Sequence, residues 1–230
     1  MNDMQTRVTA IHREMAEAAR SAGRNPEEII LIGVSKRHSA DEVVKAVNAG
    51  ITTLGENYIQ EAVDKIKTLG DLKASWHFIG HLQTNKARFA VQYFDIIHTV
   101  DSVKLAREVN KRARKINKVQ KILVQINISQ ESSKSGTAAS DALALVREAA
   151  VLENVSIRGL MGMPPFFDNP EEARPFFKEL AGIRSDIRAA EIPNVSMEHL
   201  SMGMSGDFKA AIQEGATMVR IGTAIFGERQ

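Results

Sequence analysis

The chain has 230 residues, of which 43% are hydrophobic and 25% charged, a balance typical of a globular protein with a substantial core. A net charge of +2 provides no general attraction to nucleic acid, and the lack of cysteine excludes disulfides and thiolate metal sites. No apolar run approaches the ~20 residues that cross a bilayer, so we expect a cytoplasmic protein that binds neither nucleic acid nor membrane.

Helix-like and strand-like patterns alternate along the chain. An amphipathic helix comes first, because Val8, Ile11 and Met15 recur at helical spacing. The predicted strands are residues 29–35, 52–55, 76–80, 96–100, 122–127, 157–161, 196–201 and 218–222. The predicted helices between them are residues 41–48, 59–69, 85–92, 103–116, 139–152, 171–190 and 207–213.

Eight strands that alternate with helices predict parallel βαβ units, which close naturally into a barrel. We therefore expect an α/β fold, a single (β/α)8 TIM barrel over residues 1–230 with an extra N-terminal helix. A doubly wound open sheet is the alternative. It is disfavoured because no G-x-G-x-x-G follows the first strand.

Lys36 is the most prominent candidate for chemistry, since it ends the apolar first strand. In such barrels the site lies at the carboxyl ends of the strands. A lysine there is desolvated, which lowers its pKa and suits a Schiff-base amine. The alternative is a lysine whose ammonium simply reaches solvent.

Two loops rich in small residues follow the last two strands. Residues 201–207 (SMGMSGD) and 221–224 (IGTA) each lead into a predicted helix. Backbone N–H groups and hydroxyls in such turns bind phosphate, and barrels often hold phosphate in this position. Together with Lys36 they suit a phosphate-bearing carbonyl compound, although the glycines could also serve only tight turns.

Arg220 lies two residues before Gly222, so both point to the same side of the last strand. The alternative role for an inward arginine is a buried ion pair. His77, His81 and His98 form no metal-ligand spacing, so no metal site is expected. We expect His199 to be packed or hydrogen-bonded in the barrel rather than catalytic.

Seven sequence blocks resemble one known family. They are residues 33–36 (GVSK), 55–61 (GENYIQE), 76–86 (WHFIGHLQTNK), 133–136 (SKSG), 159–161 (GLM), 200–205 (LSMGMS) and 219–227 (VRIGTAIFG). In this order and register they resemble the YggS/PROSC family of pyridoxal phosphate homeostasis proteins, which is itself similar to the N-terminal barrel of alanine racemase.

The resemblance implies pyridoxal 5′-phosphate (PLP) as the cofactor and assigns a role to each site residue. Lys36 would form the Schiff base, while Ser201, Gly222 and Thr223 would hold the phosphate. Ser205 would add a phosphate contact, Asn57 would lie near the ring, and Arg220 would face the pyridine nitrogen. A guanidinium there disfavours protonation of the ring nitrogen and makes the ring a poorer electron sink.

The resemblance also implies a carrier or buffer of PLP and not an enzyme. The chain ends at Gln230, so we expect no second domain of the racemase type and no second catalytic base. Its tyrosines are Tyr58 and Tyr93. We therefore expect a monomer whose partners are PLP and amino acids that exchange with the Schiff base. The alternative is a weak PLP-dependent racemase or lyase.

Overall fold

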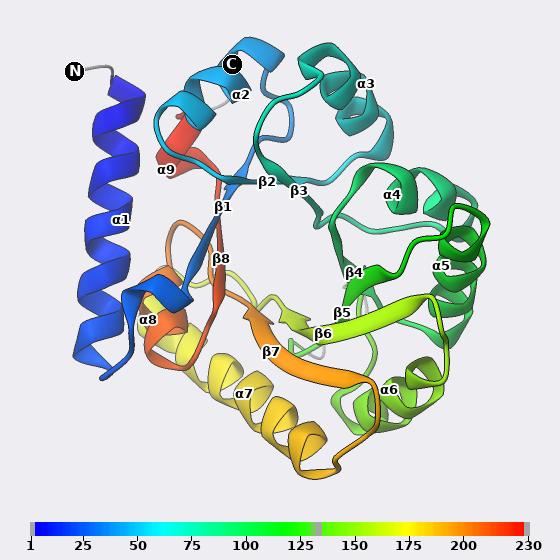
Figure 1. Ribbon diagram of the computed structural model, residues 1–230. Coiled ribbons are helices and arrows are strands. Elements are labelled where there is room, and N and C mark those ends of the chain that lie inside the picture. Colours follow the sequence, from blue (N-terminus) through cyan, green and yellow to red (C-terminus); the bar gives the residue numbers. More distant parts are fainter. Residues whose placement is uncertain (1–2, 130, 132–134, 228–230) are drawn as a thin grey trace.

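The computed structural model describes residues 3–129, 131 and 135–227. Within them, eight parallel strands form a closed barrel in chain order, with the last strand paired to the first (Figure 1). The strands are β1 (Ile30–Val34), β2 (Thr53–Glu56), β3 (Ser75–Phe78), β4 (Ile96–Val100), β5 (Gln120–Ile126), β6 (Val155–Gly162), β7 (Val195–Ser201) and β8 (Met218–Ile221). The predicted barrel is therefore confirmed, and the open sheet is excluded.

Helices surround the barrel (Figure 1). They are α2 (Ala40–Asn48), α3 (Ile59–Leu69), α4 (Ala87–Tyr93), α5 (Val103–Lys115), α6 (Ala142–Ala150), α7 (Arg174–Ala189), α8 (Phe208–Gln213) and α9 (Thr223–Phe226). Three predicted helices begin later than expected, because a 3-10 turn precedes each of them. Before α7, for example, Asn169 caps the N–H of Glu171 and Pro170 begins the tight turn.

The extra N-terminal helix is also confirmed. α1 (Asp3–Ser21) lies outside the barrel beside α8 and α9 (Figure 1), and it buries Val8, Ile11 and Met15. The side chain of Arg7 donates to the carbonyl of Ile225 over 2.8 Å. α1 therefore holds the carboxyl end of α9, a helix that begins beside the cavity described below.

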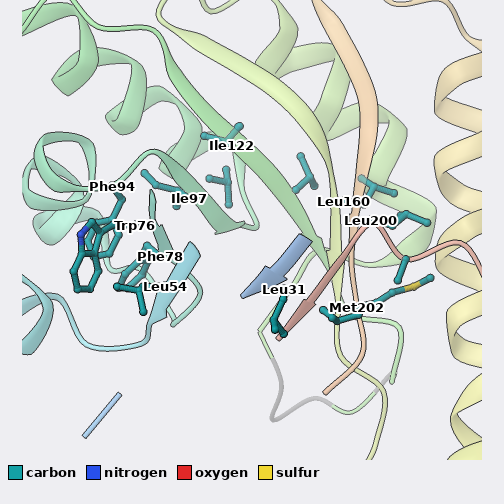
Figure 2. Packing of buried hydrophobic residues seen from close by; sticks show 14 of the residues in the cluster. Leu31, Leu54, Trp76, Phe78, Phe94, Ile97, Ile122, Leu160, Leu200 and Met202 are labelled. Carbon is teal, nitrogen blue, oxygen red and sulfur yellow. The ribbon is translucent and has the colours of Figure 1, made fainter. Parts of the chain in front are cut away.

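The core has two layers. Side chains that point outward from the strands pack against the helices, and Figure 2 shows Trp76, Phe78 and Phe94 gathered beside Leu54. A smaller cluster fills the barrel itself, with Ile32, Ile96, Leu123, Met161 and Met218 fully or almost fully buried. These apolar side chains thus pack the barrel interior.

No helix in the described part of the chain is long and apolar enough to cross a membrane.

Candidate functional site

A cavity of about 310 Å³ lies at the carboxyl ends of the strands. Lys36, Asn57, Ser205, Arg220, Gly222 and Thr223 all line it. The structure thus brings together six of the seven site residues predicted from the sequence, although they come from four separate segments of the chain. The exception is Ser201, which is not among the residues that line the cavity.

Lys36 follows β1 in a turn that backbone hydrogen bonds hold before and after it. The N–H of Ser35 donates to the carbonyl of Gly55, and the N–H of His38 donates back to the carbonyl of Ser35, each over 3.1 Å. Arg37 takes a left-handed conformation with φ of 63°, which bends the chain immediately after Lys36. The lysine is therefore held by rigid backbone while its side chain reaches the cavity.

A buried ionic network lies behind this turn. Lys65 Nζ donates to the carbonyl of Ser35 over 2.6 Å and to Glu56 Oε1 over 2.8 Å, and Ser35 Oγ donates to the same carboxylate over 2.7 Å. Burial raises the pKa of the Glu56 carboxyl, whereas the nearby Lys65 ammonium opposes that rise. Since Ser35 and Glu56 precede Lys36 and Asn57, the network fixes two residues of the cavity wall. This network was not predicted from the sequence.

Asn57 presents an unsatisfied polar atom beside the cavity. Its Oδ1 is buried and has no hydrogen-bond partner among the described residues. Buried polar atoms are nearly always hydrogen-bonded, so an exception calls for a functional or structural explanation. The amide therefore has capacity for a hydrogen bond to a molecule in the cavity.

The two loops after β7 and β8 form the opposite wall. Asp207 Oδ1 accepts from the N–H of Met204 over 2.6 Å, which closes the first loop tightly around Ser205 and Gly206. Burial raises the pKa of the Asp207 carboxyl. In the second loop α9 begins at Thr223, and its hydrogen bonds start with the N–H groups of Ile225 and Phe226, which donate to the carbonyl of Gly222, so the N–H groups of Thr223 and Ala224 precede them. Hydroxyls and backbone donors thus face the same space, as an anion requires.

Arg220 lies at the floor of the cavity with only 4% of its surface exposed. One terminal nitrogen donates to Ser201 Oγ over 2.7 Å, and the other donates to the carbonyl of Gly162 over 3.1 Å. Burial lowers the pKa of Arg220 to about 10, so its side chain remains charged at neutral pH. The nearby Asp207 carboxyl opposes this lowering of the Arg220 pKa, but the direct hydrogen bonds of the guanidinium go to Ser201 and Gly162 and not to a carboxylate of the described residues.

The hydroxyl of Ser201, a residue expected to hold the phosphate, is hydrogen-bonded within the protein. Its side chain is fully buried, and its hydroxyl contacts Arg220 and His98 Nδ1, the latter over 2.9 Å. The sequence placed Ser201 at the right strand end but could not tell that its hydroxyl points into the barrel. Ser205, four residues later, supplies the hydroxyl that lines the cavity.

The histidines separate into distinct roles. His98 Nε2 lies 3.0 Å from His77 Nδ1 inside the barrel, and burial lowers the pKa of His77 to about 4 and that of His98 well below its usual value. His199 pairs with Glu198 over 3.1 Å, which agrees with a hydrogen-bonded barrel residue. The described residues contain no group of three or more His, Cys, Asp or Glu side chains arranged to hold a metal ion.

Apolar side chains from the segment after β6 complete the cavity, and they were not predicted from the sequence. Met163, Phe167 and Pro170 line it together with Phe166, whose surface is 85% exposed. The adjacent phenylalanines of this loop, of which Phe166 is exposed and Phe167 half-buried, were the available signal. In the 133–136 block, Ser133 and Lys134 lie outside the described residues, whereas Ser135 Oγ lies 3.2 Å from His81 Nδ1.

Comparison with known proteins gives a consistent family. The family model "Alanine racemase, N-terminal domain" matches residues 8–230. The pyridoxal phosphate homeostasis protein of Aquifex aeolicus is 41% identical over 224 residues, which cover 97% of each chain. Its counterpart in Escherichia coli K12 is 40% identical over 236 residues, covering all of this chain and 98% of the other.

A solved structure agrees with this match. PipY of Synechococcus elongatus, determined with PLP bound, superimposes with a TM-score of 0.85 at 34% identity, covering 98% of this chain and all of that chain. The same protein without PLP gives a TM-score of 0.87. With its barrel and its sequence both matched over nearly their whole length, this chain belongs to the pyridoxal phosphate homeostasis proteins, within the family of the alanine racemase N-terminal domain.

Proposed function

We propose that this chain binds PLP in the cavity at the end of the barrel and acts in PLP homeostasis as a carrier or buffer of the reactive aldehyde. The supporting observation is that Lys36, Arg220 and two phosphate-type loops meet at one cavity. The PLP-bound structure of PipY, 34% identical, supports the same ligand. We further propose that residues 1–230 work as a single domain in the cytoplasm.

The residues of the cavity fit this cofactor. Its volume of about 310 Å³ lies at the lower end of the range for small-molecule sites. The unsatisfied Oδ1 of Asn57 offers a polar contact for the ring, and the apolar side chains of Met163 and Phe167 provide a surface for it. When bound, PLP supplies an aldehyde that bonds reversibly to an amine, and a ring that can accept electron density.

Each residue then has a role that follows from its environment. Lys36 supplies the amine that forms the Schiff base. Ser205, Gly222 and Thr223 hold the phosphate through hydroxyl and backbone donors, which are strong when the acceptor is charged. We propose that the hydroxyl of Ser201 binds Arg220 rather than the phosphate, because it already accepts a hydrogen bond from that guanidinium.

Arg220 supports a carrier more than an enzyme. A buried guanidinium beside the ring nitrogen disfavours protonation of that nitrogen, so the ring withdraws fewer electrons from a bound amino acid. The cavity lining among the described residues includes one carboxyl group, that of Asp207, and its Oδ1 is already bound to the N–H of Met204. We therefore propose that the protein holds PLP without efficient turnover.

The test uses the purified protein loaded with PLP. We expect a yellow protein, and borohydride reduction should fix the cofactor to the peptide that contains Lys36. Label on a different lysine, with Lys36→Ala still fully yellow, would falsify the assignment.

Incubation of the loaded protein with single amino acids tests the alternative function, a racemase or lyase. Racemised or deaminated product formed at the rate of a dedicated enzyme would replace the carrier by a racemase or lyase, and loss of this product in Asp207→Asn would identify the second base.

A further inference from the structure

A continuous chain of four polar side chains crosses the inside of the barrel. It begins at Arg220 on β8, passes through Ser201 on β7 and His98 on β4, and ends at His77 on β3. The three links measure 2.7, 2.9 and 3.0 Å, and each of the four residues is buried. The apolar side chains of Ile32, Ile96, Leu123, Met161 and Met218 pack in the same barrel interior.

The donor and acceptor chemistry of these groups allows one arrangement of the protons along the chain, called the proton order below. Arginine is only a donor, so Ser201 Oγ must accept from it, and the hydroxyl proton of Ser201 is free to point to His98 Nδ1. His98 then carries its proton on Nε2 and donates it to His77 Nδ1. His77 in turn carries its proton on Nε2.

The reverse order is unfavourable. If His98 donated from Nδ1, the oxygen of Ser201 would accept twice, and its own proton would have no acceptor among the described residues. An unsatisfied hydroxyl in this buried position is costly. Both histidines are neutral, because burial lowers the pKa of each, and the charge of Arg220 acts in the same direction at His98.

We propose that His77, His98 and Ser201 form a hydrogen-bond chain of fixed proton order that positions the Arg220 guanidinium at the floor of the cavity. His98 and Ser201 are thus positioning residues, which act on the cofactor through Arg220. The part of this inference that concerns the cofactor rests on the proposed PLP site, whereas the proton order is a property of the protein alone.

The first test measures proton order without cofactor. Long-range ¹H–¹⁵N spectra of the imidazole rings at pH 7.5 should show both His77 and His98 as neutral rings protonated on Nε2. A ring protonated on Nδ1, or a charged ring, at either position overturns the proton order. Because the wild-type protein is used, the result does not depend on whether a variant folds.

The second test measures the effect on PLP. Ser201→Ala removes the acceptor of Arg220, and we expect a shifted absorption band of the loaded protein and PLP release at least about tenfold faster, as for a lost hydrogen bond to a charged group. Ser201→Thr keeps the hydroxyl and should restore both values. His98→Leu should show the same shifted absorption band and faster PLP release as Ser201→Ala. His12→Gln, on the exposed side of α1, is the matched control and should change neither value.

The outcomes separate the two proposals. If Ser201→Ala and His98→Leu release PLP with the wild-type rate and spectrum, the positioning role is wrong although the PLP site stands. If the wild type binds no PLP, the proposed function fails, and the imidazole spectra still decide the proton order.

Discussion

The backbone of Asn57 lies directly against Gly80. A Cβ atom placed on Gly80 would lie 2.0 Å from the carbonyl oxygen of Asn57, far inside any real contact. The segments that follow β2 and β3 converge so closely only because residue 80 has no side chain. The position of Asn57 in the cavity wall therefore depends on a glycine from the next strand-end loop.

We expect Gly80→Ala to displace Asn57 and weaken PLP binding. Forcing a methyl group against backbone should also lower the free energy of unfolding by about 1–3 kcal/mol. Denaturant unfolding and the rate of PLP release measure the two effects. Gly182→Ala is the matched control, because nothing lies within 4 Å of a Cβ there, and alanine at this helical position should stabilise by up to about 1 kcal/mol. Unchanged PLP release in Gly80→Ala contradicts the role of Asn57.

The buried network behind Lys36 gives a second prediction. Lys65→Met leaves the fully buried carboxylate of Glu56 without its cation, so we expect the free energy of unfolding to fall by about 3–5 kcal/mol. Adding Glu56→Gln to this variant should recover part of the loss, since the unpaired charge is then removed. Lys67→Met, on the exposed side of the same helix, serves as the control. A small effect of Lys65→Met would mean that water reaches Glu56.

The buried histidines predict how stability changes with pH. The pKa of His77 is about 4 in the folded protein and about 6.5 when unfolded, so between these values the unfolded chain binds the extra proton. The contribution of His77 to the free energy of unfolding is fully present above pH 6.5. It falls as the pH decreases toward 4, by up to about 1.4 kcal/mol per pH unit. His98 acts in the same direction, whereas the raised pKa of Glu56 opposes both. Denaturant unfolding at pH 7.5 and 5 should show a smaller loss for His77→Gln than for the wild type, and equal losses would refute the assignment.

The sequence was a reliable guide to the barrel because its signals are local and repeated. Apolar strands and helices alternate eight times, and each strand end identifies a position on the same face of the barrel. Lys36, Gly222 and Thr223 could be assigned to that face from the strand pattern and the family resemblance together, and the cavity lining agrees with it.

Other features of the site depend on long-range side-chain packing. Ser201 and Ser205 lie in one short motif, and only the fold reveals that the first hydroxyl points into the barrel while the second lines the cavity. Likewise, His77 and His98 are 21 residues apart in the chain, and their contact depends on the neighbouring strands β3 and β4. The alternation of side chains along each strand could indicate that both histidines point into the barrel. The hydrogen-bond partner of each histidine could not be inferred from their spacing in the sequence.

We expect the protein to be a monomer. The large exposed apolar side chains of the described residues fall into two small groups, Tyr58 and Phe166 near the cavity and Ile116, Val119 and Val151 in loops that precede strands. Each group consists of two or three residues, whereas a stable homodimer interface commonly buries more than about 1,000 Å². Light scattering at micromolar concentration should give the mass of one chain. A stable dimer under these conditions would overturn this prediction.

Replacement of Arg220 should separate the binding of PLP from its activation. Replacing the guanidinium by a carboxylate in Arg220→Glu favours protonation of the ring nitrogen, so the bound ring should withdraw electrons more strongly. We expect this variant to keep some PLP through the phosphate loops and to show a changed absorption band. Exchange of the Cα proton of added alanine, measured as deuterium incorporation per bound PLP, should rise above that of the wild type.

The matched comparison is the double variant Ser205→Ala, Thr223→Ala. It removes two hydroxyls from the cavity wall but leaves Arg220 in place, so PLP should be released faster without any gain in deuterium exchange. If Arg220→Glu does not fold, Arg220→Gln removes the charge with less disturbance and should shift the exchange rate in the same direction by a smaller amount. Equal exchange per bound PLP in the wild type and both Arg220 variants would mean that the arginine does not control the ring, and the low reactivity of the carrier would then need another cause.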